Sequence, residues 1–396
     1  MLTLACANMQ NGISIGMLVP SLQALVGDMH SPEHRGKAFG YLNFTGITGS
    51  IIGGTIATVL AAGMFWGIDG WRLAFLLWTA YLAVVIAGFW FFALEGLDVI
   101  DADKGARLAQ MSQMSFWGYL RKEAEDAWTK VAAILSVPTL QVIIIPQAIG
   151  LIPWMAMSGW VTFYLEALGF TNAATAVMIL VTGLGFAAGS LLGGVLGDWA
   201  ESVDRYRGRI ALAQVSIFLG TIVFTFDLQV LPRLLDGADM LTAGLVYAVC
   251  LFFTGILTIG GTGAACNLPI ILSCLKDSHR TSGVAIERFF GSIAGSFAVP
   301  IVGVIAENYF GYHLDQDDML DPGESPAEGD VKVFQPFATR RAMVVGDSIT
   351  LVSVIAWLFC ISIWSVLYFT YPVDRLAETD AEEEALLGDD SDSPGR

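Results

Sequence analysis

The segment HSPEH, residues 30–34, is the closest match in the chain to a catalytic metal motif. Zinc hydrolases with the pattern H-x-x-E-H bind the metal through two imidazoles on one face of a continuous helix. Pro32 lies between His30 and His34, and proline favours the first turn of a helix over its interior. No third ligand accompanies them. We therefore expect a polar loop that enters a helix and no metal, with a membrane zinc hydrolase as the alternative that metal content would test.

Two further motifs fit poorly with the chemistry that they suggest. Asn43-Phe44-Thr45 matches a glycosylation site, but it lies within an apolar segment. The run Gly260-Gly261-Thr262-Gly263 lacks the lysine and the preceding strand of a phosphate-binding loop. Helix packing or local unwinding explains this run better. We assign no catalytic residue and expect neither enzymatic activity nor a resident cofactor.

Charged residues within apolar segments are stronger functional indicators, because burying a charge in hydrocarbon is costly. Glu287 and Arg288 lie in such a segment, about 10 Å along a helix from Arg280 at 1.5 Å per residue. They have three interpretations: a gate, a proton site or a buried ion pair. Proton or ion coupling stays open.

Composition defines the class of protein. Of 396 residues, 55% are hydrophobic and 14% are charged, against roughly 25% charged in a typical soluble domain, and the mean hydropathy is +0.64. These values predict an all-α polytopic membrane protein in contact with the lipid bilayer. They exclude a soluble enzyme, a nucleic-acid-binding protein and a secreted disulfide scaffold. We expect a monomer.

Apolar runs long enough to cross a bilayer, about 20 residues each, predict nine transmembrane helices. They cover residues 1–26, 38–63, 71–93, 140–168, 173–197, 210–230, 241–272, 284–309 and 349–371. The polar interval 94–138 predicts an amphipathic helix whose apolar face holds Phe116, Leu120, Ala127, Trp128, Val131 and Leu135.

Basic residues gather in alternate loops, which are expected to face the cytoplasm. This pattern predicts a cytoplasmic C-terminus. The acidic tail contains Glu382-Glu383-Glu384-Ala385-Leu386-Leu387, which resembles an acidic dileucine signal for lysosomes or vacuoles. A solvated tail is the alternative.

A stretch near the start of the chain recurs in its second part. His34-Arg35 and His279-Arg280 are 245 residues apart, and each pair joins two apolar segments. Many transporters consist of such repeated halves. After the first pair, small residues at helical spacing predict close helix packing. They are Gly46, Gly49, Gly53 and Gly54.

Several motifs together resemble the major facilitator superfamily. Gly194 and Asp198, followed by Arg205 and Arg209, resemble the loop motif between helices eight and nine. Gly12 and Gly16 resemble the helix-four pattern, Asp28 to Lys37 the turn after helix four, and Trp71-Arg72 the start of helix six. A loose similarity extends to spinster-like members. Asn8 replaces the helix-four arginine, and Ser50 replaces the proline of antiporters.

The resemblance implies twelve helices in two halves, of which this chain matches helices four to twelve. The expected domains are an incomplete N-terminal half (1–95), a cytoplasmic central loop (96–137), a six-helix half (138–371) and an acidic tail (372–396).

The resemblance also implies site residues. Asp198 is expected to face the helix that starts near Arg35, and Arg209 to pair with Asp277. These residues would form a cytoplasmic latch, and a wider gating and charge network is expected to include Asp28, Arg205 and Arg280 as well. The substrate-cavity candidates are Asn8, Asn11, Gln23, Gln147, Trp154, Trp160, Thr258, Thr262 and Asn267.

We therefore predict transport of a small-molecule solute by rocking of two helical halves about a midplane site. The alternative is a truncated, non-transporting remnant or a membrane sensor. Because three helices face six, the chain as written is expected to transport poorly.

Overall fold

The structure is a computed structural model that describes residues 2–61, 64–65, 67–92, 116–259, 263–311, 333–335 and 340–375. Thr262 and the dileucine segment lie outside these ranges, and so do the side chains of Asn8, Asn11, Asp28 and Asp277. The chain forms two compact units, residues 1–47 with 133–396 and residues 48–132. Residues 1–47 thus group with the C-terminal helices by contacts, and the domain boundaries given above stay a prediction.

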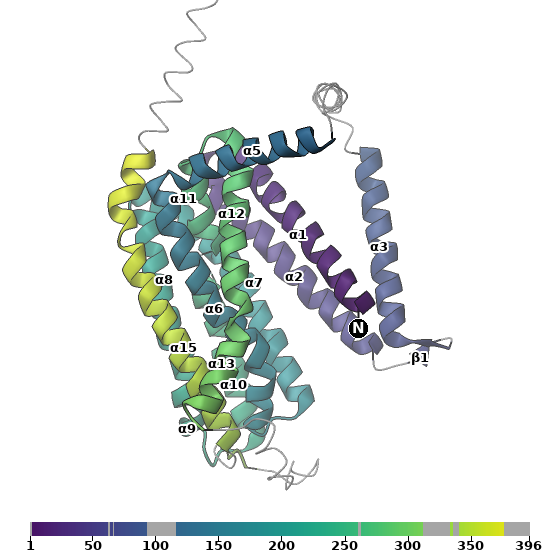
Figure 1. Cartoon of the computed structure of the whole chain (residues 1–396). Helices are drawn as coiled ribbons and strands as arrows, with labels where there is room; N and C mark the ends of the chain where they lie inside the picture. Colours follow the sequence, from purple (N-terminus) through teal and green to yellow (C-terminus); the bar gives the residue numbers. More distant parts are fainter. Residues whose placement is uncertain are drawn as a thin grey trace, which may run out of the picture. The chain divides into compact units, whose positions relative to one another are not determined.

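The first part of the chain is helical at the three predicted positions (Figure 1). Its elements are α1 (Leu2–Met29), the short helix η1 (Pro32–His34), α2 (Arg35–Ala61), the strands β1 (Met64–Phe65) and β2 (Ile68–Asp69), and α3 (Gly70–Phe92). The strands pair antiparallel around Gly67, whose φ of 78° favours glycine. This small hairpin was not predicted.

The HSPEH segment does not form one helix. The α1 helix ends at Met29, and η1 begins at Pro32. His30 bonds through Nδ1 to the carbonyl oxygen of Val26 at 2.8 Å, whereas His34 ends η1. The two imidazoles therefore lack the common helix face that the zinc motif requires.

The predicted amphipathic helix is α5 (Phe116–Leu135). Its C-terminal end enters the core, where Ile134 is fully buried. Trp128, which was placed on the apolar face, is 72% exposed.

The remaining elements form the helices of the C-terminal part. They are α6 (Pro138–Ala167), α7 (Asn172–Val203), α8 (Gly208–Thr225) with the π-helical turn η2 (Phe226–Val230) and α9 (Leu231–Leu234), α10 (Met240–Ile259), the π-helical turn η3 (Gly263–Asn267), α11 (Leu268–Ser273), α12 (Asp277–Ser296), α13 (Ala298–Asn308) and α15 (Arg340–Trp364). Helical structure continues over residues 367–375.

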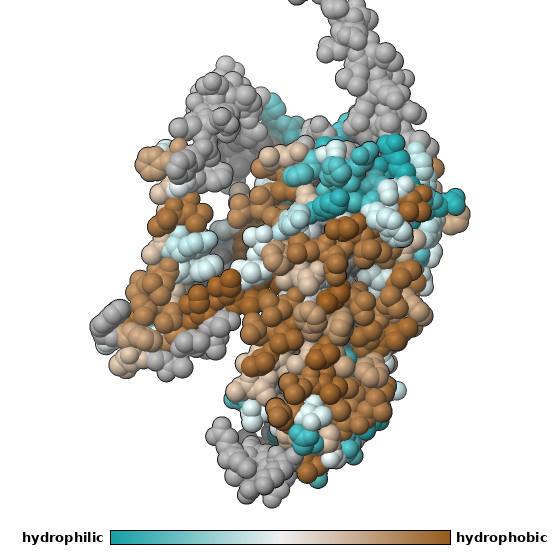
Figure 2. All heavy atoms as spheres, turned by 180° about the vertical axis from the view of Figure 1, so that it is seen from behind, coloured by the Kyte–Doolittle hydropathy of each residue, from teal (hydrophilic) through white to brown (hydrophobic). Residues whose placement is uncertain are grey.

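Six stretches of the described residues are long and apolar enough to cross a membrane. They are Pro138–Ala167, Asn172–Val203, Gly208–Leu234, Met240–Thr258, His279–Asn308 and Arg340–Trp364. Shorter apolar stretches, Gly12–Gly27 and Arg72–Gly88, lie in α1 and α3. Figure 2 shows apolar side chains over much of the helical surface and hydrophilic ones gathered most densely at one end. An apolar surface of this extent fits contact with lipid.

Gly36 and Gly40 of α2 make close helix contacts. An added methyl group at Gly40 would lie 2.7 Å from the Ser190 carbonyl oxygen of α7. At Gly46 and Gly49 it would meet no described atom within 4 Å, and at Gly53 it would meet Trp78 at ordinary contact distance. Packing of another helix along the predicted stripe therefore stays a prediction.

Candidate functional site

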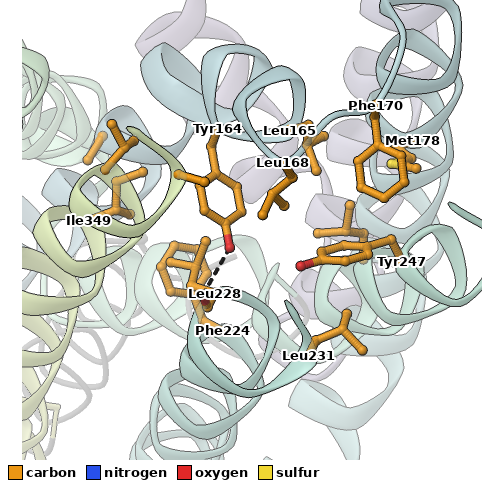
Figure 3. Packing of buried hydrophobic residues seen from close by; sticks show 14 of the residues in the cluster. Tyr164, Leu165, Leu168, Phe170, Met178, Phe224, Leu228, Leu231, Tyr247 and Ile349 are labelled. Carbon is orange, nitrogen blue, oxygen red and sulfur yellow. Dashed lines mark hydrogen bonds between the residues drawn. The ribbon is translucent and has the colours of Figure 1, made fainter. Parts of the chain in front are cut away.

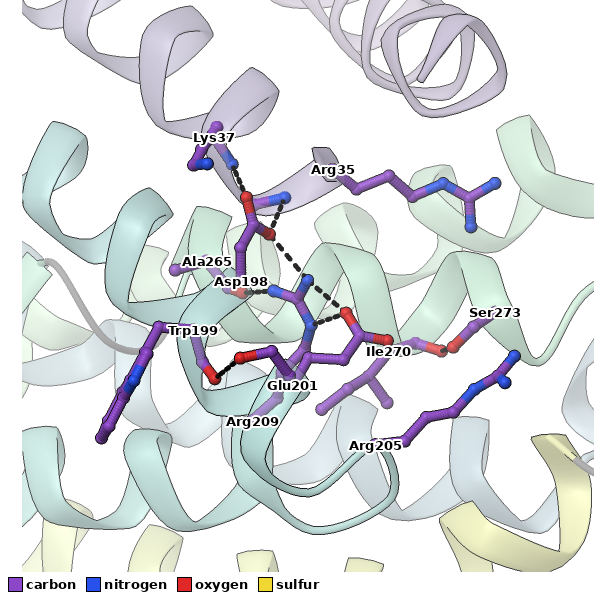
Figure 4. Close-up of polar contacts among 12 residues, drawn as sticks. Arg35, Lys37, Asp198, Trp199, Glu201, Arg205, Arg209, Ala265, Ile270 and Ser273 are labelled. Carbon is purple, nitrogen blue, oxygen red and sulfur yellow. Dashed lines mark hydrogen bonds and ion pairs between the residues drawn. The ribbon is translucent and has the colours of Figure 1, made fainter. Parts of the chain in front are cut away.

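The strongest polar cluster forms where the end of α7 meets the start of α2. Asp198, near the C-terminal end of α7, accepts hydrogen bonds from the first free N–H groups of α2: Gly36 N reaches Oδ1 at 2.8 Å and Lys37 N reaches Oδ2 at 2.9 Å (Figure 4). A carboxylate at a helix N-terminus also interacts favourably with the helix dipole. Asp198 thus connects segments that are about 160 residues apart.

Two glycines permit this contact. An added methyl group at Gly194 would lie 2.6 Å from the Gly36 carbonyl oxygen, and one at Gly36 would lie 2.8 Å from the Gly194 carbonyl oxygen. Real Cβ atoms do not approach backbone oxygens so closely. The glycine of the loop motif therefore lets α2 come near enough for its N–H groups to reach Asp198.

Arg209 supplies the positive charge that pairs with the two α7 carboxylates, Asp198 and Glu201. Its Nη2 donates to Asp198 Oδ1 at 2.9 Å and to Glu201 Oε2 at 2.6 Å, and its Nε donates to the same Glu201 oxygen at 2.9 Å. Its Nη1 donates to the Ala265 carbonyl oxygen. All three nitrogens of the guanidinium therefore have partners other than Asp277, the predicted one, whose side chain lies outside the described residues.

The network extends to the end of the last helix. Arg375 is 5% exposed and donates to Glu201 Oε1 at 2.7 Å, to the Arg205 carbonyl oxygen at 2.7 Å and to Tyr371 Oη at 2.8 Å. Arg205 thus takes part through its backbone, while its side chain is exposed. We call Asp198, Glu201, Arg209 and Arg375 the gate network.

The first four residues of the segment predicted as an acidic tail, 372–375, are described by the structure. Residues 372–375 continue a helix, and Asp374 Oδ2 accepts a hydrogen bond from Thr139 N at 2.7 Å. Contacts of Asp374 and Arg375 with the folded helices were not predicted, because the acidic composition of this segment indicated a solvated tail. Glu201 was also missed, although its position three residues after Asp198 places it on the same helix face.

The repeat seen in the sequence is also a repeat of contacts. Arg35 Nε donates to the Gly27 carbonyl oxygen at 2.9 Å, and Arg280 Nε donates to the Leu272 carbonyl oxygen at 3.2 Å. Donor and acceptor are eight residues apart in both copies, and both arginines are buried. Each therefore fixes a helix start, α2 or α12, against the end of the preceding helix.

A second polar group lies inside the C-terminal helices. Asn267 Nδ2, at the end of η3, donates to Glu287 Oε1 of α12 at 2.9 Å. Arg288 Nε lies 3.5 Å from Glu287 Oε2. Both Asn267 and Glu287 are 1% exposed, and Asn267 Oδ1 and Glu287 Oε2 are buried without a hydrogen-bond partner among the described residues. Each of these two side chains therefore has one buried oxygen atom without a hydrogen bond in the described part of the chain.

Three other cavity candidates have contacts with protein groups. Trp154 packs against Phe186 and Trp357, with ring centroids 5.3 Å and 5.8 Å away. Trp160 Nε1 donates to the Val299 carbonyl oxygen at 3.1 Å, and Thr258 donates to the Thr254 carbonyl oxygen. Trp154 and Trp160 therefore contact neighbouring helices, whereas the Thr258 bond lies within α10.

The two glutamines among the candidates differ in burial. Gln23 is 4% exposed and its Oε1 has no hydrogen-bond partner among the described residues. Gln147 is half-buried. Gln23, like Asn267, is therefore a buried polar side chain whose amide oxygen has no hydrogen-bond partner among the described residues.

The fold and these sites define a polytopic helical membrane protein with a buried charge network at one end of its C-terminal helices. A sequence model of the Major Facilitator Superfamily matches residues 3–299. The chain therefore belongs to this superfamily, whose general activity is membrane transport of small solutes. No curated protein and no solved structure matches the chain.

Proposed function

We propose that the protein carries a small solute across the membrane by rocking-type alternating access, and that the gate network closes one end of the pathway. The observation that carries the proposal is the contact of Asp198 with the N-terminus of α2. It joins the two parts of the chain that must separate when that end opens.

The way in which the network is divided supports a reversible latch. Its four charged side chains all belong to residues 198–375, and the backbone N–H groups of Gly36 and Lys37 bind to it from the first part of the chain. Opening would break these two hydrogen bonds and leave the buried ion pairs intact. Hydrogen bonds to charged groups contribute about 1.5–3 kcal/mol each, and this scale suits a transition between two populated states.

The interior groups support the solute site. Asn267, Glu287 and Gln23 are buried and keep unused hydrogen-bonding atoms. Such groups are costly unless a partner satisfies them in some state of the cycle. We infer that the solute takes part in hydrogen bonding at Asn267 and Glu287.

Thiol accessibility tests the latch. In a cysteine-free background, Gln23→Cys reports on access to the interior from the end that holds the gate network. Asp198→Asn replaces one acceptor oxygen by an NH2 group that faces the N–H groups of α2, and should raise the labelling rate about 10- to 100-fold, the population change that 1.5–3 kcal/mol produces.

Glu166→Gln, an exposed carboxyl near the other end of α6, is the matched control and should leave the rate unchanged. Equal rates for wild type and Asp198→Asn would refute the latch.

Uptake of candidate solutes into reconstituted vesicles tests transport itself. A chain that keeps the latch but moves none of them would favour the membrane-sensor alternative.

We further infer a lysosomal or vacuolar location from the Glu382–Leu387 segment, which lies outside the described residues. Replacement of Leu386 and Leu387 by alanine should move the protein to the cell surface. An unchanged distribution, observed by fluorescence microscopy of a tagged chain, would reject this inference.

A further inference from the structure

Asp227 is a buried carboxyl group without a charged partner. It lies in the π-helical turn η2 and is 2% exposed. Thr254 of α10 donates to Oδ2 at 2.5 Å, whereas Oδ1 is buried without a hydrogen-bond partner among the described residues. No lysine, arginine or histidine of the described residues forms an ion pair with it. An ionised carboxylate in such a place would be strongly unfavourable.

The elements around η2 supply few groups that could balance a negative charge. Tyr164 of α6 and Tyr247 and Cys250 of α10 face this region, and each is neutral in its ordinary form. On α9, Arg233 is exposed and donates to the Gln229 carbonyl oxygen at 2.6 Å. On α15, Asp347 is half-buried and carries the same sign of charge as an ionised Asp227.

The backbone at this position is also unusual. A π-helical turn contains one more residue than the α-helical turn that it replaces, and such turns occur frequently at functional sites. Within this turn, the Leu228 carbonyl oxygen accepts a hydrogen bond from Tyr164 Oη at 2.9 Å (Figure 3). Tyr247 lies in the same cluster, and its hydroxyl is buried without a partner among the described residues.

We propose that Asp227 is a proton-binding site, with the proton held on the carboxyl group by the surroundings formed by η2, Thr254 and Tyr247. A metal ion is a poor alternative occupant, because hard cations take six or more oxygen ligands. No group of three or more His, Cys, Asp or Glu side chains that could hold a metal occurs among the described residues.

The site is separate from the gate network. Asp227 follows Arg209 by 18 residues, or roughly 27 Å along a helix at 1.5 Å per residue. It therefore lies near the opposite end of α8. The π-helical turn also allows the Asp227 carboxyl group to move. A return of this turn to α-helical hydrogen bonding would shift the helix register and carry the carboxyl group with it. The site does not depend on the proposed transport cycle.

Infrared spectroscopy of the full chain in lipid nanodiscs at neutral pH tests the proposal. The difference spectrum of wild type minus Asp227→Asn should contain the C=O stretch of one protonated carboxyl group. Asp236→Asn, an exposed aspartate in the following loop, is the matched control and should lose no such band. A difference spectrum that instead contains only ionised carboxylate bands would overturn the proposal.

Thermal unfolding gives a second measurement that needs no band assignment. Aspartate in an unfolded chain is ionised above about pH 4. A native state that keeps the proton must therefore lose stability as the pH rises above that value. Asp227→Asn, which resembles the neutral acid, should unfold as the wild type does at low pH and lose this part of the pH dependence. An identical pH dependence of both proteins would contradict the site.

The Thr254→Val variant separates a neutral from an ionised carboxyl group. A hydroxyl donor stabilises the charged form. Without it, the protonated band should persist to higher pH than in wild type. If Asp227 were ionised in the wild type, the same variant would leave a buried charge without its one donor, and the folded protein would be lost at neutral pH.

Discussion

The gate network and the interior carboxyl groups differ in how completely their bonding capacity is used. Every carboxylate oxygen of Asp198 and Glu201 accepts a hydrogen bond from an N–H group. Glu287 and Asp227 each keep one buried oxygen without a hydrogen bond in the described part of the chain. Both kinds of site are buried, so exposure does not explain the difference.

This difference in hydrogen bonding indicates a different role for each region. A fully satisfied polar network has one favourable arrangement and fixes it, whereas a partly satisfied one is unfavourable until something else binds. We therefore regard the gate network as a device that stabilises one conformer. The interior groups are those at which we propose that a proton or a solute binds.

The largest expected effect is the removal of the cation from the gate network. Arg209→Ala would leave Asp198 and Glu201 buried with less than 11% of their side chains exposed. Breaking a buried ion pair from one side costs about 3–5 kcal/mol. The thermal midpoint, followed by tryptophan fluorescence in detergent, should fall markedly.

Arg121→Ala is the comparison for that experiment. Arg121 pairs with Glu125 on the exposed face of α5, with 83% of its side chain accessible. Its loss should leave the midpoint unchanged, because exposed pairs contribute little. Similar midpoints for both variants would show that the gate network does not hold the fold together.

A substitution at the crossing of α2 and α7 should have the next largest effect. Gly36→Ala places a methyl group 2.8 Å from the Gly194 carbonyl oxygen, and such overpacking costs about 1–3 kcal/mol. Gly46→Ala in the same helix meets no described atom within 4 Å and should stabilise the helix by up to about 1 kcal/mol. The two alanines should thus shift the thermal midpoint in opposite directions. A decrease of equal size in both would contradict the assigned crossing.

The interior pair offers a test through pH. Asn267→Asp places a second carboxyl group within 2.9 Å of Glu287 Oε1, and two carboxylates so close share a proton. The native state then holds a proton that the unfolded chain releases, so stability should fall as pH rises, by up to about 1.4 kcal/mol per pH unit. Wild type, measured by the same thermal unfolding over the same pH range, is the reference. If the difference in stability between the two proteins did not change with pH, the carboxyl groups at positions 267 and 287 would move apart in the folded protein instead of sharing a proton.

The sequence predicts the membrane fold well because long apolar runs decide it. Membership of the superfamily and an all-helical, multi-pass membrane protein are confirmed. Helix starts also follow from local chemistry, since Pro32 marks the break between α1 and α2. The count of nine spans stays a prediction. The hairpin of β1 and β2 was missed because each strand has only two residues, too few for an alternating pattern.

The candidate site was less predictable, because spacing along a helix does not say which neighbour comes near. The glycines at 46–54 have the same pattern as those at 36 and 40, but the latter pair faces α7. Asp227 was passed over as one polar residue within an apolar run. Its burial and the identity of Thr254 as its donor depend on packing between α8 and α10.

The smallest expected effect concerns Asp374, in the segment predicted as tail. The α6 helix begins at Pro138 after Val137, which provides no side-chain cap. Asp374 supplies the missing acceptor from another helix, because its Oδ2 binds Thr139 N at 2.7 Å. Loss of a helix cap costs typically about 1 kcal/mol, so Asp374→Ala should lower the thermal midpoint slightly. Asp374→Asn keeps an acceptor oxygen and should lose less, only the part due to the helix dipole. Glu307→Ala, an exposed carboxyl in α13, controls for the change in net charge. If the alanine variant unfolded at the wild-type midpoint, residues 372–375 would contribute nothing to the start of α6, and the tail would begin where the composition predicted.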